Sequence, residues 1–376
     1  MAEPIQLFMV AGEPSGDRIG ADLVKRLRVD HRVTLTGVGG AELEGEGLKS
    51  LFPMTDLSVM GLSDVLKRLP LLLWRIRQTV QAIMRHAPDL VVLIDSQVFS
   101  QTVAQRLRKA GYTGEILLYV APSVWAWKPE RAPVLKPLYN EVLAVLPFEP
   151  AVMRKLGGPE TVYVGHPALE QTTFRPSEPE RGPVLLLPGS RVGELRRHLP
   201  LMEQVALALS SHPRVTGFVL PTPKAMEQTV FETVTQWKTP VFVTTTGEGK
   251  RKGFAESIAA VAVSGTVTLE LALSGVPMAI TYVGDRGQMK RWYKYKPRFI
   301  GLPNILYGND LVPEFVGPAP QPGPVIDAIE DLLEDPAAVE RQRAGFRRVR
   351  SGMEQGRVDP LTRILAHLPQ RLPIGT

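Results

Sequence analysis

Short runs of aliphatic and β-branched residues alternate along the chain with longer segments in which apolar positions recur every three or four residues. In the first half, the short runs are 5–10, 32–38, 90–95, 115–120, 141–146 and 161–165. Parallel strands that are buried on both faces are typically this uniformly apolar, and the longer segments have the period of amphipathic helices. The alternation predicts an α/β domain with a doubly wound parallel sheet.

The same alternation begins again after a segment that has no period. Residues 167–183 contain four prolines and charges of both signs, which is typical of a linker. A second series of apolar runs follows, at 184–191, 214–220, 240–246, 258–266 and 276–283. We therefore predict two doubly wound domains, 1–166 and 184–345, and expect a helical, arginine-rich tail, 346–376, to pack back toward the N-terminal domain.

Composition excludes several classes of protein. The chain of 376 residues has an ordinary apolar fraction of 44% and no cysteine, which excludes a disulfide framework, a thiolate zinc site and a cysteine nucleophile. The N-terminus carries Glu3 and lacks the basic segment of a signal peptide, and no run reaches the ~18 apolar residues of a membrane span. We therefore expect a soluble or peripheral protein.

Lysine and arginine total 44 against 38 acidic residues, and two stretches without an acid concentrate the basic side chains. They are 65–87 and 286–309, and the second also contains Trp292, Tyr293 and Phe299. Basic amphipathic helices of this kind bind anionic membrane surfaces, and a core-facing helix with a solvated basic face has the same pattern. No RNA- or DNA-binding motif accompanies them, so we expect no nucleic-acid partner.

The common nucleotide and metal motifs are absent. The sequence contains no GxxxxGK[ST], no GxGxxG, no HExxH and no Asp-x-Asp, so P-loop chemistry, ordinary dinucleotide binding and a carboxylate-held metal lose support. We expect no metal and no cofactor. Any bound anion would be held by backbone amides and basic side chains.

Two loops of the second half have suitable residues for that task. Gly189 and Arg191 follow an apolar strand and precede a helix, where partial positive charge and a guanidinium face the same anion. The alternative is a surface arginine after a turn. The segment 264–266 also begins a helix, and Glu270 follows one turn later, where it can accept hydrogen bonds from ribose hydroxyls. Ordinary helix capping explains this second segment equally well.

Two loops of the first half also contain candidate site residues. In the segment 11–17, Gly12 and Gly16 permit a tight turn and a close ligand approach, although a plain strand-to-helix turn has the same pattern. Asp95 ends an apolar strand. A carboxylate in that place is suited to act as a general base, and it is also a common helix cap.

Eight segments together carry a family resemblance. They are AGEPSGD (11–17), VMGLSDVL (59–66), APSVWAWK (121–128), LPFE (146–149), VGHP (164–167), LPGSRVGE (187–194), SGTVTLE (264–270) and GLPNILYGNDLVPE (301–314). In this order they resemble the lipid-A-disaccharide synthases, the inverting glycosyltransferases of family nineteen. No single segment is decisive, but the ordered set is specific and covers most of the chain, to about Pro313.

The resemblance implies a GT-B fold, in which two Rossmann-like domains face across a cleft. It implies that UDP-2,3-diacylglucosamine binds mainly to the C-terminal domain and the acceptor, 2,3-diacylglucosamine 1-phosphate (lipid X), to the N-terminal domain. The reaction joins the two sugars and releases UDP. The implied location is cytoplasmic and peripheral, on the anionic inner face of the cytoplasmic membrane.

The resemblance also assigns roles to residues. Asp95 matches the catalytic base, Arg191 the diphosphate-binding arginine, and Glu270 the ribose contact; Asn304 is expected to contact nucleotide or sugar, although an Asx-turn is equally consistent. Further donor-side contacts are expected at Gly189, Ser190, Ser264, Gly265 and Thr266. The acceptor side is expected to include Gly12, Glu13, Ser15, Gly16, Asp17, Met60, Gly61, Ser123 and Trp125.

The segment after the base departs from the family pattern. The family continues Pro-Asp-Phe-Asn, whereas this chain has Gln97, Val98, Phe99 and Ser100. Two alternatives to an active synthase therefore remain open. One is a divergent paralogue that binds a UDP-sugar without efficient transfer, and the other is a different GT-B enzyme of UDP-sugars, such as a UDP-N-acetylglucosamine 2-epimerase or a polyprenyl-linked sugar transferase.

Overall fold

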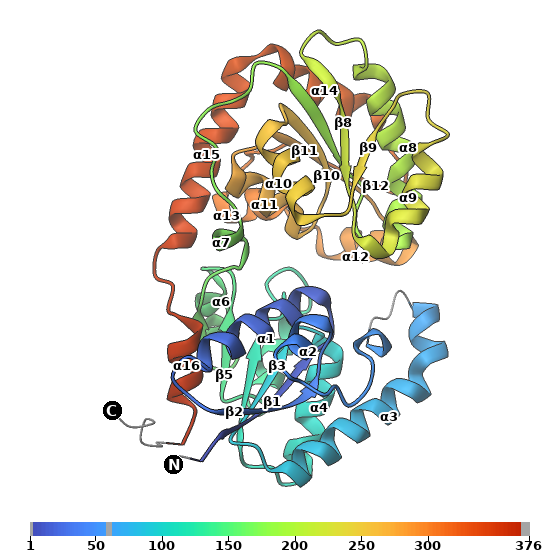
Figure 1. The fold of residues 1–376 in the computed structure, drawn as a ribbon. Helices are drawn as coiled ribbons and strands as arrows, with labels where there is room; N and C mark the ends of the chain where they lie inside the picture. The colour runs from blue at the N-terminus through green and yellow to red at the C-terminus, as the bar shows by residue number, and fades with distance from the viewer. Residues whose placement is uncertain (1–2, 58–61, 370–376) are drawn as a thin grey trace. The chain divides into compact units, whose positions relative to one another are not determined.

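The computed structural model describes residues 3–57 and 62–369, with side chains from residue 68 onward in the second range. These residues form two compact units (Figure 1). Unit 1 comprises the chain up to Pro167 and the chain from Gly356 onward, and unit 2 comprises Ala168–Gln355. Each unit contains a six-stranded parallel sheet flanked by helices. The predicted fold class, two doubly wound α/β sheets, is confirmed.

The strands of unit 1 are β1 (Ile5–Ala11), β2 (Val33–Val38), β3 (Leu90–Ile94), β4 (Glu115–Tyr119), β5 (Glu141–Ala144) and β6 (Thr161–Tyr163). They lie in the order β2-β1-β3-β4-β5-β6. The helices are α1 (Pro14–Leu27), α2 (Ala41–Gly45), α3 (Leu62–His86), α4 (Gln97–Lys109), α5 (Ala132–Leu135), α6 (Glu149–Lys155) and α16 (Pro360–Ala366), with short 3₁₀ turns at Met54–Asp56 and Pro129–Arg131.

The strands of unit 2 are β7 (Gly182–Leu187), β8 (Val215–Pro221), β9 (Phe242–Thr244), β10 (Ala259–Val263), β11 (Met278–Val283) and β12 (Glu314–Gly317). They lie in the order β12-β11-β10-β7-β8-β9. The helices are α7 (Ala168–Gln171), α8 (Val192–Leu209), α9 (Glu227–Val234), α10 (Gly247–Glu256), α11 (Thr266–Ser274), α12 (Arg286–Tyr295), α13 (Leu302–Tyr307), α14 (Pro322–Glu334) and α15 (Pro336–Glu354), with a 3₁₀ turn at Lys224–Met226.

The central strands explain why the apolar runs are continuous. Every residue of β3 and of β10 is buried, because helices cover both faces of each sheet. Burying a leucine or valine side chain completely contributes about 1.5–3 kcal/mol, so alternate polar positions in these strands would destabilise the core. Polar and functional side chains therefore lie outside these two strands.

Most of the predicted linker 167–183, the segment 168–183, packs within unit 2. It contains α7 and the buried Arg175, whose guanidinium donates to the carbonyl oxygens of Phe254 (3.2 Å), Ser257 and Gly275 (3.2 Å). These bonds tie the segment to the helices and strands of the second sheet. An isolated linker has no such partners.

The tail divides at a later residue than 346. Phe346 of α15 is fully buried in the core of unit 2, whereas Val358 N donates to the carbonyl of Tyr163 in unit 1 (2.9 Å). Arg363 of α16 then forms an ion pair with the buried carboxylate of Glu141 at the start of β5. Thus α15 completes unit 2, and α16 completes unit 1.

Candidate active site

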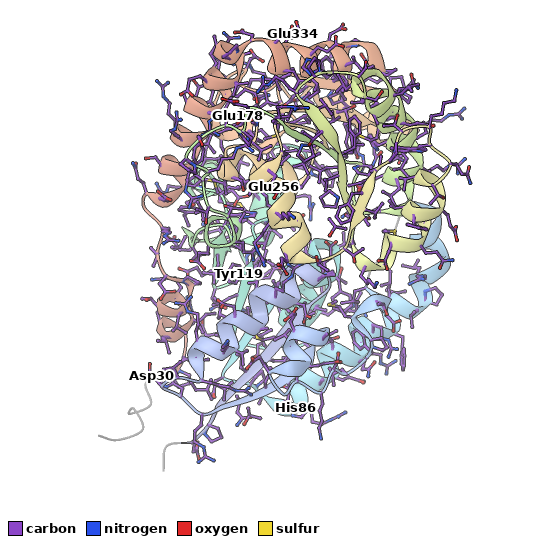
Figure 2. The ribbon with its side chains drawn as sticks, turned by 45° about the horizontal axis from the view of Figure 1, so that its top comes forward. Asp30, His86, Tyr119, Glu178, Glu256 and Glu334 are labelled. Atoms are coloured by element: carbon purple, nitrogen blue, oxygen red, sulfur yellow. The ribbon has the colours of Figure 1, made fainter. Side chains whose placement is uncertain are left out.

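Two neighbouring strands of unit 1 end in residues with strained backbone. β3 is followed by Asp95 and Ser96, with φ of 52° and 43°, and β4 by Val120, with φ of 75°. Such angles cost non-glycine residues about 1–3 kcal/mol and are least favourable for a β-branched side chain. Backbone hydrogen bonds hold these strained residues in place. Asp95 N donates to the carbonyl of Tyr119 (2.9 Å), a residue labelled in Figure 2, and Val120 N donates to the carbonyl of Leu143 (2.9 Å). Strain of this kind marks the edge as a candidate site.

Asp95, the predicted base, lies half-buried where β3 leads into α4. The first turn of α4 contains no acidic residue, so the positive end of the helix dipole favours a carboxylate at this place. The Ser100 hydroxyl donates to the Asp95 carbonyl (2.8 Å) and supports the strained turn. Val98, which replaces the family's aspartate, is 77% exposed in the same turn. The arrangement can present one carboxylate to a substrate hydroxyl.

The two glycines after β1 are required by a close approach to this turn. A Cβ atom on Gly12 would lie 1.7 Å from Ser96 Oγ, and one on Gly16 would lie 3.2 Å from Ile94 Cγ2. The loop therefore packs directly against the end of β3. Beside these glycines, Ser15 is exposed and Glu13 is half-buried.

Asp17, which the sequence predicts on the acceptor side, has a structural role in the loop that precedes α2. Its side chain is 3% exposed, and its carboxylate accepts hydrogen bonds from Gly40 N (2.8 Å), Glu42 N (3.0 Å) and Leu43 N (3.3 Å). These donors are the otherwise unpaired amides at the start of α2. Two other predicted acceptor residues, Met60 and Gly61, lie outside the described residues.

The loop after β4 contains the predicted residues Ser123 and Trp125, both half-buried. The indole Nε1 of Trp125 donates to Glu149 Oε1 (3.2 Å), and the ring packs edge-on against Phe148 at 5.1 Å between centroids. Burial raises the pKa of Glu149 to about 7. Sequence reasoning did not single out Glu149, although it lies in the LPFE segment, because burial of a glutamate has no local signal.

In unit 2, the predicted anion-binding donors are occupied by a carboxylate of the chain itself. Glu194 accepts hydrogen bonds from Ser190 N (2.9 Å) and Arg191 N (3.3 Å) and pairs with the Arg191 guanidinium (3.3 Å). A Cβ on Gly189, whose φ is 101°, would lie 2.5 Å from Glu194 Oε2. The Arg191 side chain remains 56% exposed, so an incoming diphosphate can reach it and compete with Glu194 for the same donors.

The loop after β10 lies at the same edge of the sheet, because β10 pairs with β7 in parallel. Its Ser264 hydroxyl donates to the carbonyl of Ile300 (2.7 Å), whereas Gly265 and Thr266 are exposed. A Cβ on Gly265 would meet no atom within 4 Å, so the start of α11 has open space in front of it. This space is suited to a ligand phosphate.

Glu270, the predicted ribose contact, forms an ion pair with Lys250 of α10, and its side chain is 18% exposed. The pair links α10 to α11. Ribose hydroxyls would therefore meet a carboxylate that already has one cationic partner.

His198 of α8 is a second residue that sequence reasoning missed. It is completely buried, its Nε2 accepts a hydrogen bond from Val283 N (2.8 Å), and its Nδ1 donates to the carbonyl of Glu194 (2.8 Å). Burial lowers the pKa of His198, which keeps the ring neutral as these two bonds require. The histidine thus fixes the first turns of α8 to the end of β11.

Asn304, the expected nucleotide or sugar contact, is buried, and its side chain bonds to the chain itself. It is 1% exposed; Nδ2 donates to Val312 O (2.8 Å) and Glu314 Oε1 (2.7 Å), and Oδ1 accepts from Leu311 N (3.0 Å) and Val312 N (2.8 Å). All four bonds stay within the segment 301–314. The residue therefore folds this loop.

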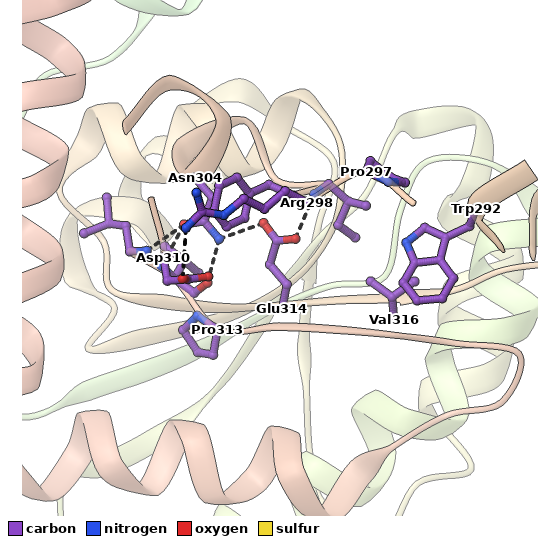
Figure 3. A pocket seen from close by; sticks show the side chains of 12 residues that line it. Trp292, Pro297, Arg298, Asn304, Asp310, Pro313, Glu314 and Val316 are labelled. Atoms are coloured by element: carbon purple, nitrogen blue, oxygen red, sulfur yellow. Dashed lines mark hydrogen bonds and ion pairs between the residues drawn. The ribbon is translucent and has the colours of Figure 1, made fainter. Parts of the chain in front are cut away.

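Asn304 and Glu314 lie at a cavity of about 550 Å³ (Figure 3). Glu314 also accepts from Ile300 N (2.8 Å) and Gly301 N (2.9 Å), and burial raises its pKa. Trp292 and Arg298 line other parts of the cavity. The polar atoms of Asn304 and Glu314 already have partners within the chain, so these two side chains form part of the cavity wall.

The described residues contain no group of three or more histidine, aspartate or glutamate side chains placed to hold a metal ion. Within the same part of the chain, no helix is long and apolar enough to cross a membrane.

The two six-stranded parallel sheets, each flanked by helices, define a protein with the GT-B fold. The glycotransferase of kitacinnamycin has a TM-score of 0.62 at 16% identity, with 98% of this chain and 100% of that chain covered. UDP-GlcNAc 2-epimerase from Neisseria meningitidis, solved bound to UDP-GlcNAc, has a TM-score of 0.58 at 12% identity, with 93% and 97% covered. Likeness at these identities shows the fold alone, and transferases and epimerases share it.

The family follows from the sequence comparisons. The lipid-A-disaccharide synthetase family matches residues 7–364. The lipid-A-disaccharide synthase of Rhodopseudomonas palustris (strain ATCC BAA-98 / CGA009) is 40% identical over 367 residues, which are 94% of this chain and 93% of that protein. The chain belongs to the lipid-A-disaccharide synthase family and is a glycosyltransferase of lipid A biosynthesis, acting on lipid A precursors. The predicted family and activity are confirmed.

Proposed function

We propose that the chain transfers diacylglucosamine from UDP-2,3-diacylglucosamine to lipid X with inversion, and that Asp95 is the general base. The observation that carries this assignment is the strained turn at Asp95, which holds a carboxylate at the strand edge. In the proposed step, the acceptor hydroxyl gives its proton to Asp95 as its oxygen bonds to the anomeric carbon. The bond from that carbon to the diphosphate breaks, and UDP leaves with the electron pair.

On the donor side, we propose that the diphosphate displaces Glu194 from Ser190 N and Arg191 N. The Arg191 guanidinium and the amides at the starts of α8 and α11 would then stabilise the charge on the leaving UDP. The Glu270 carboxylate would accept hydrogen bonds from the ribose hydroxyls, while Lys250 balances the negative charge of Glu270. No step requires a metal ion, because positive charge comes from these groups.

The test is transfer by the purified protein in EDTA. We expect UDP and disaccharide 1-phosphate to form from the two diacylated substrates. Absence of both products with native, folded protein would contradict the proposed reaction, and product formation only with added magnesium would contradict the metal-free donor site.

We also propose that α3 binds the anionic inner face of the cytoplasmic membrane, which makes the protein peripheral. One face of α3 is in the core, with Ile76 and Ile83 buried, whereas Leu69 (42%), Leu73 (42%) and Trp74 (55%) are exposed. An apolar exposed strip with arginines on the same helix fits the boundary between lipid headgroups and chains. The two interpretations of residues 65–87 therefore belong to two faces of α3: one face packs in the core, and the other is proposed to bind the membrane.

Vesicle co-sedimentation tests this surface. We expect binding to anionic vesicles at low salt, release at high salt because screening weakens each charge contact, and loss of binding in Leu69→Ser/Leu73→Ser. The control is Val29→Ser, which removes another apolar side chain of unit 1 that is 78% exposed. Equal binding to anionic and zwitterionic vesicles, or equal loss in both variants, would contradict the proposal.

A further inference from the structure

Glu149 is a buried carboxylate at the carboxyl edge of the unit 1 sheet, and the metal-free transfer mechanism does not use it. It is the first residue of α6 and is 3% exposed. Its Oε2 accepts a hydrogen bond from Leu146 N (3.0 Å), at the end of β5, and its Oε1 accepts one from Trp125 Nε1 (3.2 Å). Both oxygens are therefore acceptors of N–H groups.

The loop that Glu149 contacts begins beside Asp95. Tyr119, the last residue of β4, accepts the hydrogen bond from Asp95 N, and the strained Val120 follows it. At its far end, the Arg131 guanidinium donates to Gln101 Oε1 of α4 (2.9 Å). The loop is thus fixed to α4 at one side and, through the Trp125 indole, to α6 at the other.

We propose that Glu149 is a positioning residue for the transfer reaction: its carboxylate holds the Trp125 loop in place at the edge where Asp95 meets the acceptor. The inference rests on the proposed function, because the acceptor side is itself a proposal there. Glu149 acts through Trp125 and does not touch the reacting atoms.

The chemistry of the contact makes it depend on ionisation. Burial raises the pKa of Glu149 to about 7, against the lowering effect of its hydrogen bonds to Leu146, Trp125 and Val145. Protonation places a hydrogen on an oxygen that already faces an N–H donor, so one contact must lengthen. Tyr163 of β6 also senses the charge of Glu149, and burial raises the pKa of Tyr163 to about 12. Tyr163 therefore stays neutral near pH 7.

Loop position and fold stability should therefore respond to pH in opposite directions. The Trp125 contact is complete when Glu149 is ionised, above pH 7. The free energy of unfolding changes in the opposite direction. A carboxyl whose pKa is higher in the folded state binds more protons there, so the stability that this carboxyl contributes is lost as pH rises through the folded-state pKa. A purely structural role predicts that activity follows stability, whereas the positioning role predicts that it rises as stability falls.

The first experiment observes the indole N–H resonances of the five tryptophans by NMR from pH 5.5 to 8.5. Trp125→Phe assigns the Trp125 resonance by its absence. We expect this resonance to titrate with a midpoint near 7 in the native chain and to stay constant in Glu149→Gln. The matched control is Glu130→Gln, an exposed carboxylate in the same region, which should leave the titration unchanged.

The second experiment measures transfer over the same pH range. With one required ionisation near pH 7, kcat should rise about tenfold from pH 6 to pH 8 in the native chain, and this rise should vanish in Glu149→Gln while UDP affinity stays constant. A Trp125 resonance that does not titrate overturns the proposal, as does a rise in kcat that persists in Glu149→Gln. The NMR result needs no turnover, so an inactive protein with a titrating Trp125 would contradict the proposed function separately.

Discussion

Replacing Asn304 with alanine should destabilise unit 2 and leave UDP affinity unchanged. The substitution removes four hydrogen bonds from a side chain that is 1% exposed. The amide and carbonyl of Val312 lose their partners in a buried place, whereas Glu314 keeps its bonds to Ile300 N and Gly301 N. With about 1–3 kcal/mol for each buried group left without a partner, and two such groups, the expected loss is about 3 kcal/mol.

Urea unfolding, followed by a signal of unit 2, measures this loss, and calorimetry measures UDP binding to the folded variant. The matched control is Asn309→Ala, in the same loop, whose exposed side chain accepts only one bond, from Arg298 (2.7 Å); its expected effect is within about 0.5 kcal/mol. Asn304→Asp adds a second carboxyl beside Glu314, so its deficit should grow as pH rises. Native-like stability of Asn304→Ala together with lost UDP binding would refute the reasoning and restore a ligand contact.

Four further changes separate binding, chemistry and folding. Arg191→Ala removes a charge-assisted contact worth about 1.5–3 kcal/mol, so UDP should bind roughly ten- to a hundredfold more weakly by calorimetry in EDTA; unchanged affinity would exclude the proposed diphosphate site. Asp95→Asn should lower transfer by ~10²–10⁴ in a product assay with UDP affinity constant, and native transfer rates would exclude Asp95 as base. Val98→Asp should raise transfer, because a second carboxylate would support Asp95 or the acceptor; unchanged or lower transfer would contradict this assistance. His367, whose pKa is raised by the Glu141 carboxylate, should stabilise unit 1 below pH ~6.5 and lose that effect as pH rises, so the stability difference between native chain and His367→Gln should shrink from pH 6 to pH 9; a constant difference would contradict this.

The sequence predicts the sheets well because burial on both faces demands uniformly apolar strands. It also identifies loops at strand ends, since apolar runs stop there. The individual role of a polar side chain depends on partners that are distant along the chain. Asp17 bonds to amides of Gly40 and Leu43, and Glu149 bonds to Trp125. Nothing near these residues in the sequence indicates such partners.

The prediction of the donor loop illustrates the same limit. Sequence alone predicts an anion site at Gly189 and Arg191, because a glycine and a guanidinium precede a helix. That Glu194 folds back onto Ser190 N and Arg191 N follows from the positive φ of Gly189 and the first turn of α8. The local sequence pattern predicts the N–H donors at Ser190 and Arg191, but it does not predict that Glu194 accepts their hydrogen bonds in the ligand-free chain.

The division of the chain has a consequence for dissecting the protein. Unit 2 is one continuous segment, Ala168–Gln355, inserted between two parts of unit 1. It is therefore the piece that simple truncation yields, whereas cutting the chain at Pro167 discards α16 and exposes the Glu141 carboxylate without its arginine. The two parts of unit 1 meet where Val358 N bonds to Tyr163 O (2.9 Å). A short glycine–serine bridge from Pro167 to Gly356 would rejoin unit 1 as a single minimal polypeptide.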